Sequence, residues 1–311
     1  MADMRWLRKL LLGISPKETS ASVRGFPRTE SPVRARLETV GATFVEGYMS
    51  VLDSARASDI ERSLQSVPLD RRGFAYEGAA MSCALLDTLT PWNRSRFHDL
   101  LRGPGAPHVY LLYVGLGWAR ARLRKTRSVL ARSDDPLFGW LTFDGMGFHE
   151  GFFHWRRSYE DRQRVRGIEG PAARVYDQGL GRCSWFVYGA RIDEIADVIG
   201  RFAPERHEDL WGGVGLAAAY AGGLDRKELA DLKRLAGEHW RALAQGATFA
   251  AEARERAGNP TEHTEAACVE FFGGSGREAA QLTEVVKNAL PEGGDAPAYL
   301  RWRAGIREQL H

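Results

Sequence analysis

The sequence predicts an all-α protein, and three of its features carry that prediction. Side chains that cap helices stand directly before proline five times, at Ser15, Ser31, Thr90, Asp135 and Asn259. A capping oxygen accepts a hydrogen bond from an early backbone N–H, and proline lacks a donor that would have no partner there, so each pair is typical of a helix start. Apolar residues recur every three or four positions, as in residues 192–199, and the alternating patterns typical of strands are scarce.

The expected helices follow from these starts in chain order. They are residues 32–53, 57–66, 72–89, 92–101, 107–125, 136–143, 148–160, 191–202, 206–222, 225–256, 260–272, 276–289 and 297–310. Glycine-rich joints separate them, and none is long enough to be a flexible linker, so residues 1–311 are predicted to form one compact domain. Gly145 and Gly147 indicate a turn before a helix, and residues 176–183 indicate a corner where a helix gives way to a turn.

A weak internal similarity suggests two related helical halves. Gly78 matches Gly213 at an offset of 135 residues, and the same offset pairs Ile60 with Ile195. A true repeat would relate residues 32–125 to residues 172–256 across a pseudo-twofold axis, with a pocket at the seam between the halves. Chance similarity between amphipathic helices explains the matches equally well.

Composition limits the classes of function. The chain has 311 residues, 44% of them hydrophobic, which is enough to bury a substantial core. Its 43 Lys and Arg residues nearly balance 40 Asp and Glu residues and are spread along the chain, so no nucleic-acid partner is expected. No stretch is long and apolar enough to span a bilayer, although residues 4–12 could attach weakly to a membrane surface. Three widely spaced cysteines predict neither a disulfide framework nor a zinc cage, and we expect a cytoplasmic protein.

Residues 144–155 (DGMGFHEGFFHW) form the densest group of titratable and aromatic side chains, and they are the first candidate for a catalytic site. His149 adjoins Glu150, and Glu150 and His154 stand four apart, on one face of a helix. A histidine oriented by a carboxylate can move protons near neutral pH without a metal. His149 and His154 are five apart, which argues against a zinc-protease arrangement. A packed helix junction with hydrogen-bonded histidines is the alternative.

A non-haem metal remains a further alternative for this segment. Glu150 and His154 could join a carboxylate from another helix around iron or manganese. No resident cofactor is predicted otherwise. The chain contains no G-x-x-x-x-G-K-[ST] phosphate loop and no G-x-G-x-x-G placed after a strand, so the sequence implies no nucleotide.

Two predicted helices are rich in small residues. Gly78 lies in the first and Gly213 in the second, and glycine in a helix interior costs about 1 kcal/mol against alanine. Close helix crossing would offset that cost. Alternatively, the missing side chains make room for a ligand, lined by Tyr76 and Trp211. Glu77 precedes the first apolar run, where it either has a shifted pKa or complements the amide end of its helix.

Further side chains complete the predicted site. Asp177 is a fifth candidate catalytic residue, beside His149, Glu150, His154 and Glu77. The candidates for ligand binding are the glycines of the small-residue helices and nearby aromatic or imidazole side chains: Tyr76, Gly78, His108, Tyr110, Phe153, Trp211, Gly213 and Tyr220.

Several motifs, in order along nearly the whole chain, resemble one bacterial family. They are residues 72–81 (RGFAYEGAAM), 103–110 (GPGAPHVY), 147–155 (GFHEGFFHW), 176–182 (YDQGLGR), 209–211 (DLW) with 220–223 (YAGG), and 257–260 (AGNP). The chain resembles the domain-of-unknown-function family encoded beside the iterative polyketide synthase in enediyne biosynthesis clusters. The resemblance implies an accessory role in forming the enediyne core, on a polyene or polyyne precursor. It transfers no catalytic residues, because the family has no settled ones.

Two functional hypotheses follow. In the first, the protein is an enzyme of core maturation in which His149, Glu150, His154 and Glu77 handle protons or hold a metal. In the second, it is non-catalytic, and it either shields a hydrophobic ligand or serves as a scaffold for the synthase or other core-forming enzymes. Alanine at His149 or His154 separates the two, because only the first requires those side chains.

Overall fold

The computed structural model describes residues 5–27, 32–54, 57–90, 92, 94–123, 135–293 and 296–311. These residues form helices and connecting turns with no strand among them, which confirms the predicted all-α class. None of the helices in this part of the chain is long and apolar enough to cross a membrane.

The α-helices of the described residues begin and end as follows. They are α1 (Arg5–Leu12), α2 (Ala21–Arg24), α3 (Arg34–Asp53), α4 (Ala57–Ser66), α5 (Arg72–Leu89), α6 (Arg96–Arg102), α7 (Val109–Arg122), α8 (Leu141–Phe153), α9 (Gly170–Val187), α10 (Ile192–Gly200), α11 (His207–Ala221), α12 (Arg226–Ala236), α13 (Trp240–Arg256), α14 (Glu262–Phe271), α15 (Gly276–Asn288) and α16 (Ala298–Glu308). Short 3-10 or π turns are η1 (Pro16–Thr19), η2 (Ala106–His108), η4 (Phe138–Trp140), η5 (Arg156–Glu160), η6 (Pro204–Arg206) and η7 (Gly237–His239).

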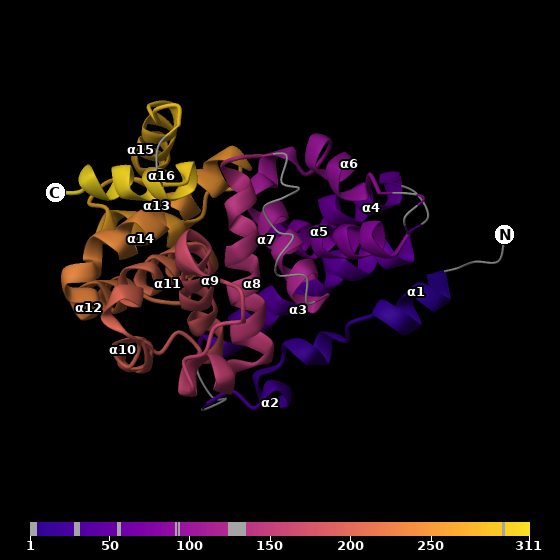
Figure 1. The fold of residues 1–311 in the computed structure, drawn as a ribbon, viewed down its shortest axis with the longest axis horizontal. Coiled ribbons are helices and arrows are strands. Elements are labelled where there is room, and N and C mark those ends of the chain that lie inside the picture. The colour runs from indigo at the N-terminus through magenta and orange to yellow at the C-terminus, as the bar shows by residue number, and fades with distance from the viewer. Residues whose placement is uncertain are drawn as a thin grey trace.

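The long helices form a row through the molecule (Figure 1). In order, α3, α5, α7, α8, α9, α11 and α13 each make their main contacts with the preceding and following member. The shorter helices α4, α6, α10 and α12 connect successive members of the row. The middle of each helix inside the row is therefore buried on two opposite sides, which is why α5, α7, α8, α9 and α11 lack a polar face. Helix α3, at the end of the row, exposes Arg36, Thr39 and Glu46.

Neighbouring helices of the row cross at glycines. In α8, a Cβ on Gly145 would stand 2.0 Å from the Val114 carbonyl oxygen of α7, and one on Gly147 would stand 2.0 Å from the Tyr176 carbonyl oxygen of α9. Because Gly145 and Gly147 are two residues apart on a helix, they face opposite sides, one toward α7 and the other toward α9. The arrangement recurs 34 and 68 residues later, at Gly179 with Gly181 and at Gly213 with Gly215. Close backbone approach thus offsets the helix cost of glycine.

This crossing pattern corrects several predicted helix boundaries. The turn expected at Gly145 and Gly147 is wrong, because α8 runs through both glycines. The corner expected at residues 176–183 is also wrong, because they form the middle of α9, a helix that the sequence did not predict. The predicted helix 225–256 is broken at Gly237, whose φ of +54° is left-handed.

Local signals also failed at two predicted starts. Thr261 rather than Asn259 caps α14, since the Thr264 backbone N–H donates to Thr261 Oγ1 at 3.4 Å. Thr90 ends α5 instead of starting a helix, and α6 begins only at Arg96. Helices α4 and α5 have the predicted bounds. Ser31, Pro91 and residues 124–125, at other predicted helix ends, lie outside the described residues.

The helix crossings by themselves account for the match between Gly78 and Gly213. Gly78 of α5 approaches the Phe44 carbonyl oxygen of the preceding helix, and Gly213 of α11 approaches that of Gln178, each at 1.9 Å from the Cβ position. The offset of 135 residues spans four crossings of the row, through α7, α8 and α9. The cleft described below borders α8, which belongs to neither of the two proposed halves.

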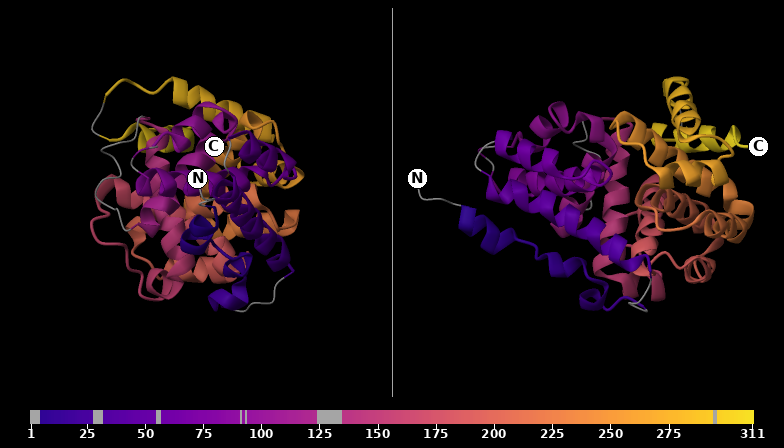
Figure 2. Two further views of the ribbon diagram at one scale, coloured as in Figure 1. Left: turned by 90° about the vertical axis from the view of Figure 1, so that its right-hand side faces the viewer. Right: turned by 180° about the vertical axis from the view of Figure 1, so that it is seen from behind.

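The N-terminal segment passes along one edge of the row before α3 begins (Figure 2). Helix α1 and turn η1 both contact α3, and Lys9 pairs with Asp53. The Tyr48 hydroxyl donates to the Leu12 carbonyl oxygen at 2.8 Å. These contacts bring residues 13–19 opposite the end of α8.

Candidate functional site

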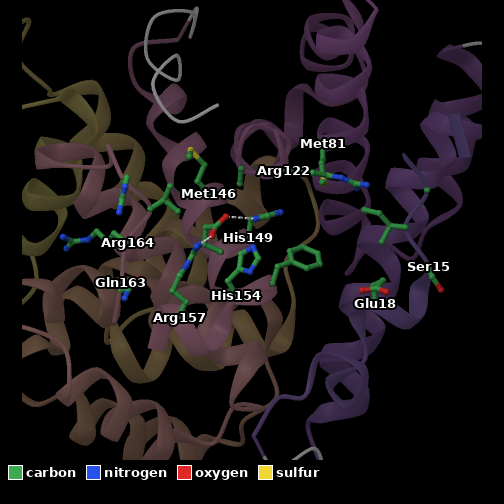
Figure 3. A pocket seen from close by; sticks show the side chains of 17 residues that line it. Ser15, Glu18, Met81, Arg122, Met146, His149, His154, Arg157, Gln163 and Arg164 are labelled. Carbon is green, nitrogen blue, oxygen red and sulfur yellow. Dashed lines mark hydrogen bonds and ion pairs between the residues drawn. The ribbon is translucent and has the colours of Figure 1, made fainter. Parts of the chain in front are cut away.

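A cleft of about 990 Å³ opens between the N-terminal segment and the C-terminal half of α8 (Figure 3). Five segments line it: Gly13, Ile14, Ser15 and Glu18; Met81; Ala121 and Arg122; Met146, His149, Glu150, Phe153 and His154; and Arg157, Gln163, Arg164, Val165 and Arg166. The segment predicted from residues 144–155 is therefore the floor of the cleft, and His149, Glu150, His154 and Phe153 meet there.

Glu150 is held as a carboxylate by its neighbours. His149 Nδ1 lies 3.3 Å from its Oε1, and the Arg157 guanidinium pairs with its Oε2. Burial opposes ionisation, but the hydrogen bond and charge of His149, followed by the charges of His154 and Arg157, outweigh it and lower the pKa of Glu150. Glu150 is thus placed to orient the His149 imidazole at the cleft surface.

His154 lies at the end of α8 rather than within it. Its backbone N–H donates to the Glu150 carbonyl oxygen at 2.9 Å, and the residue is exposed. Partial burial lowers the pKa of His154, although the negative charge of Glu150 opposes that shift. The neutral imidazole is consequently the prevailing form at neutral pH, available to accept a proton.

The described residues at this cleft do not provide a set of ligands for the metal site considered as an alternative. No group of three or more His, Cys, Asp or Glu side chains gathers in a metal-binding arrangement within the described ranges. Both carboxylate oxygens of Glu150 already face cationic or imidazole nitrogens.

An aromatic cavity of about 50 Å³ adjoins the cleft, and Ile14, Glu18 and Phe153 border both spaces. Its other rings come from α3, α5, α7, α8 and α9: Phe44, Phe74, Trp118, Phe148, Phe152 and Phe186. The half-buried Phe153 ring lies 6.0 Å from the Trp118 ring and 4.8 Å from the His149 ring, between centroids. Phe153 therefore separates the polar cleft from the aromatic cavity.

Glu77 faces this aromatic cavity from α5 and is only 3% exposed. The Trp118 indole N–H donates to its Oε1 at 3.0 Å, and Arg182 Nη2 lies 3.9 Å from the same oxygen. Arg182 is closer to Asp144, at 2.7 Å, and its guanidinium also lies 4.5 Å from the Phe148 ring centroid.

The environment of Glu77 favours its protonated form. Burial raises the pKa of Glu77 from 4.5 to about 7, and nearby Asp144 adds to the shift, while Arg182 and the Trp118 hydrogen bond oppose it. Asp144 takes most of the Arg182 charge, which explains why Arg182 fails to hold Glu77 ionised. A carboxyl with this pKa exchanges protons readily near neutral pH.

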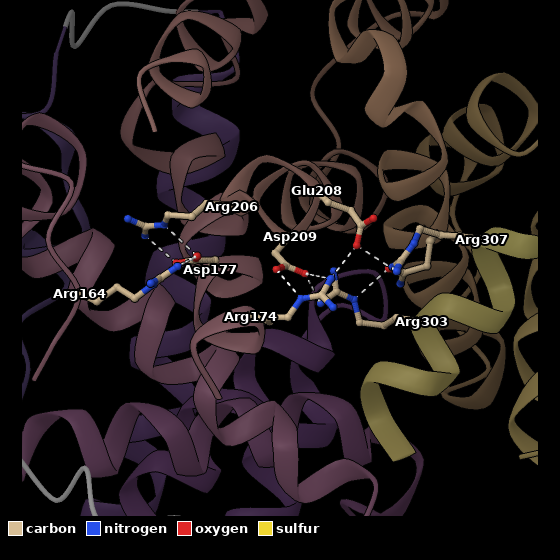
Figure 4. A network of polar contacts seen from close by, with 9 residues as sticks. Arg164, Arg174, Asp177, Arg206, Glu208, Asp209, Arg303 and Arg307 are labelled. Atoms are coloured by element: carbon tan, nitrogen blue, oxygen red, sulfur yellow. Dashed lines mark hydrogen bonds and ion pairs between the residues drawn. The ribbon is translucent and has the colours of Figure 1, made fainter. Parts of the chain in front are cut away.

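Asp177 does not line the cleft, and its carboxylate lies between Arg164 and Arg206 (Figure 4). Its carboxylate is buried and clamped by two guanidiniums: Arg206 donates from Nε at 2.9 Å and from Nη2 at 2.6 Å, and Arg164 donates from Nε at 3.1 Å and from Nη2. Each carboxylate oxygen accepts a hydrogen bond from both guanidiniums, so Asp177 has no lone pair left for a ligand. Its predicted catalytic role is replaced by an anchoring one.

Of the residues predicted to bind ligand, Phe153 alone lines the cleft or the aromatic cavity. At Gly78 and Gly213, the backbone of a neighbouring helix occupies the space that a side chain would take, as described above. The other five aromatic or imidazole candidates are buried elsewhere in the core: Tyr76, His108, Tyr110, Trp211 and Tyr220.

These five side chains pack among the long helices. Tyr76 stacks on His108 at 4.3 Å, and burial, followed by the charges of Arg72 and Arg254, lowers the pKa of His108 to about 4. Tyr110 packs on Phe249 and Trp302, and the Arg254 guanidinium lies 4.0 Å from the Tyr220 ring. At Gly78 and Gly213 themselves, backbone of a neighbouring helix stands where the predicted ligand space would open.

Sequence reasoning missed several members of the site. None of Trp118, Arg157 and Arg182 was a candidate, although each contacts Glu77 or Glu150. Trp118 and Arg182 lie in α7 and α9, which are buried on two sides and so show no apolar face. Arg157 had a usable signal, because it stands seven residues after Glu150, two helical turns along the chain.

Comparison with known proteins places the chain in a family. A family model described as "Protein of unknown function (DUF1702)" matches residues 3–310. The chain belongs to this family. Among curated proteins and among solved structures, no match to the chain was found. The DUF1702 match includes every residue of the cleft and of the aromatic cavity.

Proposed function

We propose that this DUF1702 protein is an accessory protein of enediyne biosynthesis that binds a conjugated polyene or polyyne precursor and exchanges a proton with it through Glu77. The motifs that resemble the enediyne-cluster family support the pathway. One structural observation carries the site: a carboxyl with a pKa near neutrality is buried against an aromatic cavity that adjoins an open cleft.

The chemistry of such a ligand suits this arrangement. A conjugated chain is flat and apolar, and it gains roughly 25 cal/mol for each Å² of apolar surface removed from water. The cleft is large enough for an extended chain, whereas the aromatic cavity is not. We therefore place most of the chain in the cleft, with its apolar end passing Phe153 into the aromatic cavity that Glu77 borders.

Glu77 supplies the proton-exchanging group in this proposal. It is close to half protonated at neutral pH, so it can either donate or accept. Arg182 and Trp118 would steady the carboxylate after a proton leaves. His149, oriented by Glu150, provides a second such group at the cleft surface.

A non-catalytic binding role at the same site is the second candidate. The ion pair that already engages Glu150 favours it, because a carboxylate so held is a poor base. The two candidates share the ligand and differ in whether Glu77 must titrate.

Ligand binding is tested with diphenylhexatriene, a neutral polyene whose fluorescence rises in apolar surroundings. We expect saturable binding, weakened at least about tenfold by Val165→Trp, because the indole would fill the cleft. Val269→Trp, at an exposed position of α14, is the matched control and should leave binding unchanged. Equal binding by both variants contradicts the proposed site.

Proton exchange is tested in a producing strain whose own gene is replaced by a variant. Glu77→Gln keeps the shape of the side chain and its contact with Trp118 but removes the titrating group. We expect product titre to fall at least about a hundredfold, in the range that general acid–base catalysis contributes, with diphenylhexatriene binding retained. Wild-type titre with Glu77→Gln would exclude proton exchange through Glu77.

A further inference from the structure

The charges that line the cleft do not balance. Each acid at or beside the cleft has an arginine partner: Glu18 pairs with Arg24 at 3.1 Å, Glu150 with Arg157, and Asp177 with Arg206. Three further lining arginines remain, Arg122, Arg164 and Arg166.

None of these three arginines has a carboxylate to itself. Arg164 shares Asp177 with Arg206, so one negative charge faces two guanidiniums. Arg122 contacts neutral oxygens, the Tyr48 hydroxyl at 3.5 Å and the Leu12 carbonyl at 3.4 Å. No carboxylate among the described residues pairs with Arg166, which is exposed. The cleft is therefore positively charged.

Two of the three excess arginines, Arg164 and Arg166, stand two residues apart in the chain, whereas Arg122 lies nearer the N-terminal segment, where it contacts Leu12 (Figure 3). Arg164 and Gln163 lie at one end of the cleft, with His149 and His154 in the middle and Glu18 at the opposite end (Figure 3). Glu18 also borders the aromatic cavity. A chain that points its apolar end toward the aromatic cavity thus has its other end beside Arg164 and Arg166.

We propose that the ligand of the cleft is an amphiphile: a conjugated apolar chain that carries an anionic end group, a carboxylate or a phosphate ester, bound by Arg164 and Arg166. This inference rests on the proposed function and narrows its substrate class. Guanidiniums bind either group through paired N–H donors, and partial burial of Arg164 limits screening by salt. A neutral hydrocarbon would leave Arg166 without a partner and Arg164 with only its share of the Asp177 charge.

The test uses parinaric acid, a conjugated fatty acid that fluoresces when bound, and its methyl ester, which has the same chain without the charge. We expect the acid to bind the full-length protein at least about tenfold more tightly than the ester, as one charge-assisted hydrogen bond would produce. Raising the salt concentration should weaken binding of the acid more than binding of the ester.

Variants locate the charge. Arg166→Gln should lower the affinity for the acid by about three- to tenfold and leave the affinity for the ester unchanged. Arg166→Glu should lower the affinity for the acid further. Arg226→Gln removes an exposed arginine of α12 from outside the cleft and should change neither ligand. Displacement of bound parinaric acid by dodecanoate or by dodecyl phosphate then distinguishes the two anionic groups.

The outcomes separate this inference from the function on which it rests. Equal affinity of the wild-type protein for acid and ester, or equal loss of both in Arg166→Gln, overturns the anionic end group and leaves polyene binding intact. Binding of neither probe, nor of diphenylhexatriene, overturns both proposals.

Discussion

Glu77 is the residue in which burial and chemistry are most directly linked. Its carboxyl lies between an indole N–H and a guanidinium that another carboxylate already neutralises. Ionisation in that position forfeits hydration without a full counter-charge, and the pKa rises to about 7. The same property that suits Glu77 for proton exchange therefore makes it a source of instability at alkaline pH.

The first prediction concerns the pH dependence of stability. The folded state raises the pKa of Glu77 from 4.5 to about 7 and so binds the proton more tightly than the unfolded chain. This contribution is fully present below about pH 4.5 and is lost as the pH rises through 7. Across that window wild type should lose about 3 kcal/mol relative to Glu77→Gln, at roughly 1.4 kcal/mol for each unit of pKa.

Urea unfolding of both proteins at pH 5 and pH 8 measures the difference. Comparison with Glu77→Gln cancels the contributions of other titrating groups, such as Glu252, whose pKa burial also raises to about 7. Parallel stability curves for the two proteins would show that Glu77 is ionised throughout.

At the scale of the element, glycine is the residue that builds the row of helices. A helix such as α9 carries Gly179 toward α8 and Gly181 toward α11, and at both the neighbouring backbone occupies the place of a side chain. Dispersion contacts over such short distances, together with burial of both faces, repay the lower helix propensity of glycine. Without its neighbours α9 would be a poor helix.

The second prediction compares two Gly→Ala substitutions within helices. In Gly179→Ala the methyl carbon would stand 1.8 Å from the Asp144 carbonyl oxygen, so α8 and α9 must separate. We expect a loss of about 3 kcal/mol or more in the free energy of unfolding. Gly200→Ala, at the end of α10 with nothing within 4 Å of the new atom, should be neutral or slightly stabilising. Equal effects in urea unfolding would contradict the crossing model.

At the scale of the whole molecule, one buried charge network fastens the C-terminal helix to the row. Asp209 of α11 pairs with Arg174 of α9 at 3.0 Å and with Arg303 of α16 at 2.9 Å (Figure 4). Asp209 and Arg303 are both about 1% exposed. Arg303 also donates from Nε to Gln245 Oε1 of α13 at 3.1 Å, so it ties α16 directly to α11 and α13.

The third prediction concerns this attachment. Asp209→Asn leaves the Arg303 guanidinium buried without a counter-charge, and we expect a loss of about 3–5 kcal/mol in the free energy of unfolding. Amide hydrogen exchange should accelerate first in α16, whose docking depends on that pair. Asp231→Asn breaks the exposed pair with Arg234 and should cost less than about 1 kcal/mol. Comparable losses in the two variants would argue against a fastening role.

The sequence by itself determined the all-α class, the bounds of helices such as α4 and α5, and the segment that forms the floor of the cleft. Capping groups, apolar spacing and clusters of titratable residues are local, so they can be read without knowing what lies opposite. The tertiary structure decided that α8 passes through Gly145 and Gly147, that α9 exists, and that Asp177 is an anchor. It also decided that Trp118 and Arg182 meet Glu77. Each of these depends on a partner distant in the chain. The backbone of that partner packs against the glycines and offsets their low helix propensity, and its charge sets whether a carboxyl is protonated.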